Sequence, residues 1–173
     1  MNSMLEQAYQ AKREGKTDDA MRLFEKLAAQ ARLSGDRRLL AGALKGLGQI
    51  ERDRAHTELA LAHYEEAATI ERGLSDEPTM LAHTLRHVAD ILRELGRFSE
   101  AEPLYAEALE LYRGSTNTGR LDLANALRGY ALLGGDHAAA RWREARDLYN
   151  ECGVSAGVEE CTRWLEEQQQ SGQ

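Results

Sequence analysis

Three side chains with metal-binding chemistry fall at helical spacing in the middle of the sequence. His83 and His87 are four residues apart, and Asp90 follows three residues later, so a helix would place all three on one face. Imidazole and carboxylate groups are common metal ligands in proteins. Because no fourth ligand from elsewhere accompanies the row, we interpret it as polar surface. The sequence therefore predicts no metal site and no cofactor.

No catalytic motif accompanies these residues. The sequence contains no GxSxG, no HExxH, no phosphate-binding glycine loop and no CxxC pair. The two glycines in LLGGDH follow no predicted strand, so they indicate a turn. We expect that the protein is not an enzyme.

Charge and composition exclude further classes. The net charge of -7 argues against nucleic-acid binding, because an acidic surface is repelled by a phosphate backbone. No stretch is apolar enough to cross a bilayer, and the first residues lack the apolar core of a signal peptide. We expect a cytoplasmic protein with no membrane partner. Cys152 and Cys161 flank a turn-like GVSAG and could be bridged, but in such a chain we expect free thiols.

The elements that must position these side chains repeat along the chain. LAGALK at 40–45, LAHTLR at 81–86 and LANALR at 123–128 are separated by 41 and 42 residues, a period typical of stacked helical pairs. Downstream of each copy, an alanine, an aromatic residue and a second small or apolar residue follow at helical spacing. These trios are Ala20, Phe24 and Leu27; Ala60, Tyr64 and Ala67; Ala101, Tyr105 and Ala108; and Ala138, Trp142 and Ala145.

Turn signals separate the two helices of each unit. Gly15 and Gly96 precede the second helices, with Thr17 and Ser99 as expected N-caps, whereas Ala55 stands at the corresponding place in the second unit. In the fourth unit only 11 residues separate Leu127 from Ala138, against 16 in the other units. We expect a first helix that ends near Leu133, with Gly134 and Gly135 in the turn. A competing register, with Leu123, Ala126, Leu127 and Tyr130 as the stripe, would shorten the helix by only one residue.

GRFSEAEPLYAEAL at 96–109, preceded by LAHTLRHVADIL, resembles a tetratricopeptide repeat of the longer variety found in kinesin light chains and many bacterial regulators. The resemblance covers roughly residues 1–150 and departs from the family at Glu51, where a large apolar residue is usual, and at Ala55. It implies an all-α, right-handed solenoid of four helical pairs. We expect one domain over residues 1–173, with units at about 1–35, 36–75, 76–116 and 119–152 and a capping helix at 155–169. The polar segment 73–78 would be a loop.

The resemblance implies a concave surface, lined by the first helix of each pair, that binds an extended peptide or a partner helix. Two basic rows would lie on this surface, with polar groups beside them. The candidate residues are Lys12, Lys45, Gln49, Arg52, His83, Arg86, His87, Asp90, Arg93, Asn125 and Arg128. Such a groove favours an acidic peptide or a C-terminal carboxylate. Alternatively, these charges pair with neighbours such as Glu51, Asp53 and Glu94.

The sequence thus predicts a noncatalytic protein-interaction scaffold, with two alternatives left open. Related bacterial repeat proteins act as peptide-signal receptors, normally with an attached effector domain. Self-association into a homodimer is the other possibility, through the groove or through the last helix. Trp164 would then lie either at the edge of the packed stripe or in a dimer contact.

Overall fold

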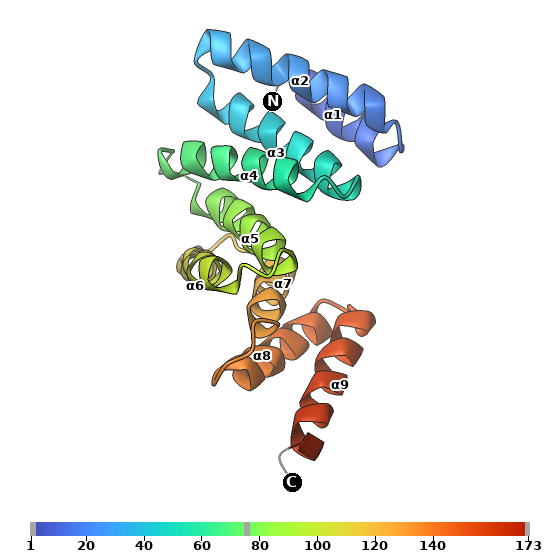
Figure 1. Ribbon diagram of the computed structural model, residues 1–173, viewed down its shortest axis with the longest axis vertical. Coiled ribbons are helices and arrows are strands. Elements are labelled where there is room, and N and C mark those ends of the chain that lie inside the picture. The colour runs from blue at the N-terminus through green and yellow to red at the C-terminus, as the bar shows by residue number, and fades with distance from the viewer. Residues whose placement is uncertain (1–2, 75–76, 172–173) are drawn as a thin grey trace.

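The chain folds as a series of α-helices. The structure, a computed structural model, describes residues 3–74 and 77–171, and these contain nine helices and no strand (Figure 1). The helices are α1 (Ser3–Arg13), α2 (Thr17–Ser34), α3 (Arg37–Asp53), α4 (Thr57–Arg72), α5 (Pro78–Glu94), α6 (Phe98–Gly114), α7 (Arg120–Ala131), α8 (Ala138–Glu151) and α9 (Ser155–Ser171). Met1, Asn2, Ser75 and Asp76, which belong to the predicted first unit and the predicted 73–78 loop, lie outside the described ranges, as do residues 172–173.

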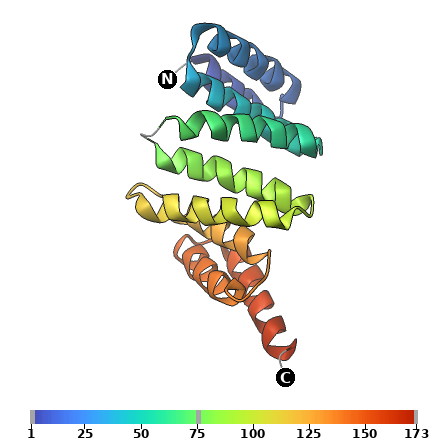
Figure 2. The ribbon, with the colours of Figure 1, turned by 60° about the vertical axis from the view of Figure 1, so that its left-hand side comes forward.

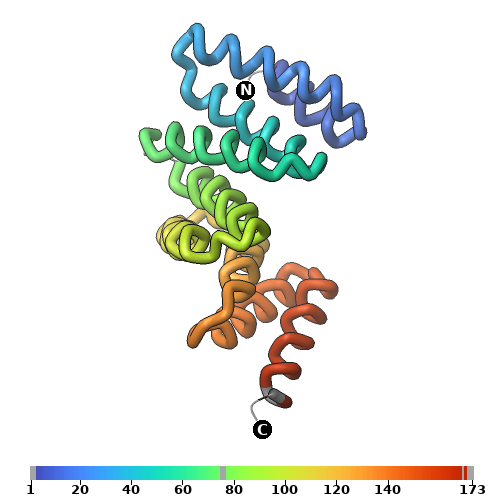
Figure 3. The backbone as a smooth tube through the Cα atoms, in the orientation of Figure 1, coloured from blue at the N-terminus to red at the C-terminus, as the bar shows by residue number. Residues whose placement is uncertain are grey.

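Consecutive helices pack against each other and the pairs stack along the long axis. The most extensive contacts join α3 to α4, α5 to α6 and α7 to α8; α2 also packs on α1 and α3, and α9 packs on α8. Figure 2 shows the stack from α1 at one end to α9 at the other, and the tube in Figure 3 shows each pair turned relative to the one before it. The prediction of an all-α solenoid of four helical pairs and a capping helix is confirmed.

The core is built from the repeated small-aromatic trios. Phe24, Tyr64, Tyr105 and Trp142 are each at most 2% exposed, and the alanines that flank them are also buried. Small neighbours let the helix backbones approach closely while the rings fill the space between successive pairs. The residues identified from spacing alone are therefore the centre of each packed unit.

Glycines on the first helices receive the rings of the preceding second helices. A Cβ atom at Gly46 would lie 2.4 Å from the Phe24 ring, and one at Gly129 would lie 2.7 Å from the Tyr105 ring. The equivalent position in α5, 41 residues after Gly46, is His87. There the ring of Tyr64 instead stacks on the His87 imidazole, with ring centroids 5.0 Å apart, and lies over Gly48. Glycine at these positions is thus a packing requirement.

The turns within the pairs agree with the glycine signals but not with the predicted caps. Gly15 and Gly96 have φ angles of 74° and 75°, and Ala55 adopts the same left-handed conformation at 62°. Thr17 is the first residue of α2 and Ser99 the second residue of α6, so Lys16 and Arg97 hold the N-cap positions without a side-chain cap bond. The prediction of Thr17 and Ser99 as N-caps is wrong, because both helices begin earlier.

The first helix of the fourth pair is short. α7 has 12 residues, whereas α3 and α5 each have 17. It ends at Ala131, and Gly134 and Gly135 then adopt positive φ angles of 81° and 83° in the turn. The predicted shortening is confirmed, which leaves less helix beside the end of α5.

Candidate functional site

Three adjoining cavities open along the first helices of the pairs. Their volumes are about 510, 260 and 220 Å³. Met80 lines the first and third cavities, whereas Lys45 and His83 line the second and third. Because the cavities share walls, we treat them as one surface and call it the inner groove. Its walls come mainly from α1, α3 and α5, and the start of α7 closes one side.

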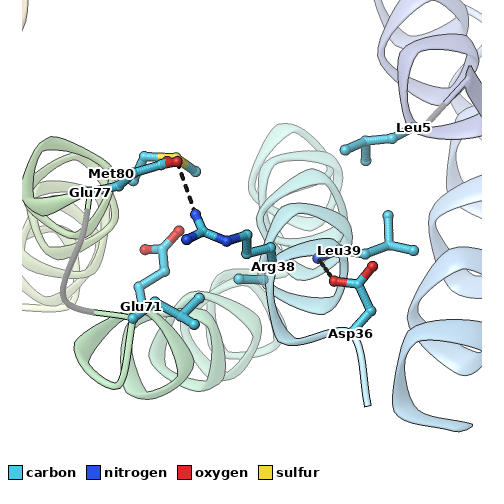
Figure 4. Close-up of a pocket in the computed structure, with 9 residues that line it drawn as sticks. Leu5, Asp36, Arg38, Leu39, Glu71, Glu77 and Met80 are labelled. Atoms are coloured by element: carbon cyan, nitrogen blue, oxygen red, sulfur yellow. Dashed lines mark hydrogen bonds and ion pairs between the residues drawn. The ribbon is translucent and has the colours of Figure 1, made fainter. Parts of the chain in front are cut away.

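The largest cavity is mostly apolar. It lies between α1, the start of α3, the end of α4 and the start of α5, and Figure 4 shows its walls. The apolar lining residues are Leu5, Leu39, Ala41, Leu74 and Met80. Asp36 accepts a hydrogen bond from the Leu39 amide at 3.0 Å, and Arg38 donates to Glu77 at 2.9 Å across the rim. This cavity suits an apolar side chain of a bound molecule.

The apolar cavity was not predicted as part of the site. Its residues come from the starts of α1, α3 and α5, from the end of α4, and from Leu74 and Glu77 between α4 and α5. The lining residues of α1, of α3 and of α4 are separated from one another by at least 30 positions of the sequence. The sequence holds one sign of the cavity, which is the large apolar residue Met80 near the start of a helix. Met80 is 39% exposed, so its side chain is available to line a cavity. Spacing within a single helix cannot reveal a cavity that several helices share.

Lys45 forms a largely buried ion pair where the cavities meet. Its Nζ lies 2.7 Å from Oε1 of Glu71, and the two side chains are only 15% and 5% exposed. Glu71 lines the first cavity and Lys45 the other two. The ammonium group is therefore already compensated by a carboxylate of the same chain, and the middle of the groove is close to neutral.

Two further ion pairs link successive units along the groove. Lys12 of α1 lies 3.5 Å from Asp53 of α3, and Arg52 of α3 lies 2.5 Å from Glu94 of α5. Lys12 and Arg52 occupy corresponding places in their units, so the pairing repeats along the solenoid. Near the C-terminal end, Arg128 of α7 donates two hydrogen bonds to the carboxylate of Glu160 in α9, each 2.7 Å long.

The alternative of internal charge pairing thus has direct structural support. Asp53 and Glu94 are paired as that alternative expected, whereas the buried Glu51 contacts His56 at 2.6 Å. On α5, Arg86 donates to Asp90 at 2.9 Å. Arg93 meets Glu94 only at 3.7 Å, a looser contact than the others.

Tyrosines from the second helices hold the polar groups of the first helices. Tyr64 donates to Gln49 at 3.2 Å and Tyr105 donates to Asp90 at 2.6 Å. Tyr149 donates to Asn125 at 2.8 Å, and burial raises its pKa to about 12. Burial likewise raises the pKa values of the Tyr64 and Tyr105 hydroxyls. These hydroxyls stay protonated at neutral pH and fix the orientation of the groups they bond.

The two histidines face the groove as neutral rings. Burial, assisted by the nearby Arg86, lowers the pKa of His83 to about 4 and lowers that of His87 further. The rings contact each other edge to face with centroids 4.6 Å apart, and Arg86 lies 3.1 Å from Nε2 of His87. Asp90 accepts hydrogen bonds from Arg86 and Tyr105. The two histidines therefore belong to the polar wall of the groove, and Asp90 follows them on the same helix. Within residues 3–74 and 77–171, no three His, Cys, Asp or Glu side chains are grouped to hold a metal ion.

The structure gathers only part of the predicted site at the groove walls. Lys12, Lys45, Gln49, His83 and His87 line the cavities. The other candidates lie on the same first helices outside the cavity linings: Arg52 on α3; Arg86, Asp90 and Arg93 on α5; and Asn125 and Arg128 on α7.

Three further observations concern the two cysteines, Trp164 and the apolar length of the helices. Cys161 is buried and Cys152 exposed, both as free thiols, and burial raises the pKa of Cys161 to about 11. Trp164 stacks on Trp142 with ring centroids 5.3 Å apart, so it packs within the chain. Among the described helices, none is long and apolar enough to cross a membrane.

Comparisons with known proteins place this arrangement in a structural context. Residues 80–152, nearly all of α5 to α8, match the model of a family described as tetratricopeptide repeat. The crystal structure of BtubC (BKLC) from P. vanneervenii is similar, with 19% identity and a TM-score of 0.63 over 95% of this chain and 77% of that chain. A putative kinesin light chain from Podosopora anserina with nearly identical TPR-like repeats is 14% identical, with a TM-score of 0.60 over 99% of this chain and 95% of that chain. A search of curated proteins finds no match.

Proposed function

We propose that this chain, in which residues 80–152 match the tetratricopeptide repeat model, is a noncatalytic interaction module that binds an extended segment of a partner polypeptide in the inner groove. Proteins of this family generally mediate protein-protein interactions and are typically noncatalytic. The observation that carries the proposal is the row of three cavities, in which the third shares Met80 with the first and shares Lys45 and His83 with the second.

The chemistry of the groove suits a polypeptide segment. The apolar cavity accepts a large apolar side chain, and burial of such a group contributes about 1.5–3 kcal/mol. The neighbouring cavity presents Gln49, Tyr9 and the neutral imidazoles of His83 and His87. Neutral donors and acceptors of this kind can bond to peptide N–H and C=O groups without the desolvation cost of a charge.

An acidic partner is a narrower proposal than a polypeptide partner. Lys12, Lys45 and Arg52 each have a carboxylate of another helix within 3.5 Å, so these cations attract a ligand less strongly than a bare basic row would. A preference for carboxylates must therefore come from a cation that is incompletely compensated. The cytoplasmic location stays a prediction from the sequence.

Self-association has less support than capture of a different partner. Trp164, the residue that would have marked a dimer contact, is accounted for by its stacking on Trp142. A peptide-signal receptor would use the same groove, with a short peptide as its natural ligand. The interaction module and the peptide-signal receptor would therefore use the same site, and the same experiment tests both.

The test is selection from a library of random seven-residue peptides, acetylated and amidated at their ends, against the purified chain. We expect binders with a large apolar residue. Their affinity should fall at least about tenfold in Met80→Trp, because the indole would fill the space shared by two cavities. Fluorescence anisotropy with labelled binders measures the change.

The matched control is Leu33→Trp, which places the same side chain on α2 at a residue that is 91% exposed and outside the groove. Circular dichroism confirms that both variants are folded. Equal loss of affinity in both variants, or no loss in either, would mean that peptides bind elsewhere. Selection that yields no binder would refute peptide binding.

A further inference from the structure

The two arginines of α5 differ from their counterparts one unit earlier. Arg86 lies 41 residues after Lys45, and Arg93 lies 41 residues after Arg52. Both cations of α3 are paired with carboxylates from other helices, Lys45 with Glu71 of α4 and Arg52 with Glu94 of α5. Lys45 and Arg52 therefore show how a cation at each of these two positions is paired with a carboxylate, and Arg86 and Arg93 can be compared with them.

Neither carboxylate recurs for α5. The residue 41 positions after Glu71 is Tyr112, whose hydroxyl is uncharged at neutral pH, and burial raises its pKa further, to about 12. The positions 41 and 42 residues after Glu94 are Gly135 and Asp136, which lie in the turn beyond the shortened α7. The shortening that the sequence predicted thus removes the helical position that would have faced Arg93.

Arg93 is left with an incomplete set of partners. Among the described residues, Glu94 is the only carboxylate within 4 Å of it, at 3.7 Å, and that group is already held by Arg52 at 2.5 Å. The Tyr105 hydroxyl is neutral, and it donates its proton to Asp90. The Nε atoms of both Arg86 and Arg93 are buried without a hydrogen-bond partner.

The charges around α5 do not balance. Arg52, Arg86 and Arg93 contribute three positive charges, and the carboxylates that they contact, Asp90 and Glu94, contribute two negative charges. Only 22% of the Arg93 side chain is exposed, so the surplus is poorly screened by water. A carboxylate that reached Arg93 would cancel the surplus and could accept two parallel hydrogen bonds from the guanidinium.

We propose that Arg93, in the last turn of α5, binds a carboxylate of the partner polypeptide. The inference rests on the proposed function and adds its chemistry: a partner segment with a carboxylate, from Asp, Glu or a free C-terminus, that lies over the end of α5. The other cations of the predicted site already have ion pairs of their own, and these cations are Lys12, Lys45, Arg52, Arg86 and Arg128.

The probes are the seven-residue peptides selected on the groove, remade in three forms. One form keeps its acidic residues and is amidated; one has Asn and Gln in their place and is amidated; one has Asn and Gln with a free C-terminal carboxylate. We expect at least one carboxylate form to bind about tenfold to a hundredfold more tightly than the neutral form. The first and third forms tell a side-chain carboxylate from a C-terminal one.

The variant is Arg93→Gln, in which this preference should disappear while the neutral form binds as before. Arg93→Lys, which keeps the charge but loses the two-pronged geometry, should retain part of the preference. The matched control is Arg146→Gln, since Arg146 also pairs with its sequence neighbour, Asp147, but on α8. Thermal melting checks that each variant is folded.

The possible failures can be told apart. Peptides that bind in the groove but show no carboxylate preference, or a preference that survives Arg93→Gln, would overturn the inference and leave the proposed function standing. A preference lost equally in Arg146→Gln would reduce it to a general effect of net charge and also overturn it. If no form binds at all, both proposals fail together.

Discussion

Gly46 shows how a single missing Cβ atom sets the spacing between two units. The ring of Phe24, fully buried, occupies the place where that atom would be. Gly129 and Gly157 hold the same relation to Tyr105 and Tyr149. Gly46 is thus required for packing. No larger side chain could replace it without moving the preceding helix.

Gly46→Ala should lower the free energy of unfolding by about 1–3 kcal/mol, because the new methyl group would overlap the Phe24 ring in a core that has no room to shift. Gly114→Ala is the matched control, since a Cβ atom at that place in α6 meets nothing within 4 Å. It should be neutral or stabilising by up to about 1 kcal/mol. Urea denaturation of the two variants measures both changes, and an equally stable Gly46→Ala would disprove the overlap.

Glu51 is the second residue whose role differs from the family pattern. It is 3% exposed at a place where a large apolar side chain is usual, and its carboxylate contacts His56 in the turn after α3. The polar group is tolerated because a partner from the following turn satisfies it. The departure is therefore a local structural substitution, and the groove does not use it.

The turn within each of the first three pairs requires one residue in the left-handed backbone conformation. The turns of the first and third pairs use Gly15 and Gly96 at positive φ, and the second uses Ala55 at 62°. A residue with a Cβ atom is strained in the left-handed region, by about 1–2 kcal/mol. The second pair accepts this strain because buried residues anchor the helices on both sides of the turn, Ile50 in α3 and Ala60 in α4.

Ala55→Gly should stabilise the chain by about 1 kcal/mol, since glycine adopts the left-handed conformation without strain and the gain is reduced by its greater freedom when unfolded. The same substitution at Ala62, an exposed residue in the middle of α4, should instead destabilise by about 1 kcal/mol. Opposite signs in thermal unfolding are the expected signature. Two losses of similar size would contradict the assignment of strain to Ala55.

At the scale of the molecule, a stack of pairs must close its last exposed face. α9 covers α8 through the stacking of Trp164 on Trp142, through Gly157 under the Tyr149 ring, and through the ion pair of Glu160 with Arg128 on α7. It thus occupies the place that the first helix of a fifth pair would take. Solenoids depend on such a cap because each unit is stabilised mainly by its neighbours.

Deletion of residues 155–173 should therefore lower the free energy of unfolding by about 3 kcal/mol or more, because Trp142 and Tyr149 would lose their cover. The exposed face should also cause self-association, which light scattering at several concentrations detects. Gln168→Ala, at an exposed position of the same helix, should leave both properties unchanged. A truncated chain that stays monomeric and equally stable would show that α9 is not a cap.

The sequence by itself determined the helices, their pairing, the buried trios and the shortened α7. These features follow from periodicity and from turn residues, which act over a few positions of the chain. The N-caps at Thr17 and Ser99 were mispredicted because several polar residues compete at a helix start, and neighbouring positions cannot rank them.

Only the tertiary structure decided what the basic residues do. Lys45 with Glu71, Arg52 with Glu94 and Arg128 with Glu160 join residues 26 to 42 positions apart, and the apolar cavity at Met80 draws on four helices. A charge row read along one helix cannot reveal the carboxylates that a neighbouring helix brings to it. Arg93 stands apart because its neighbour α7 is short: the sequence determined the length of that helix, and the packing determined which cation it leaves without a dedicated partner.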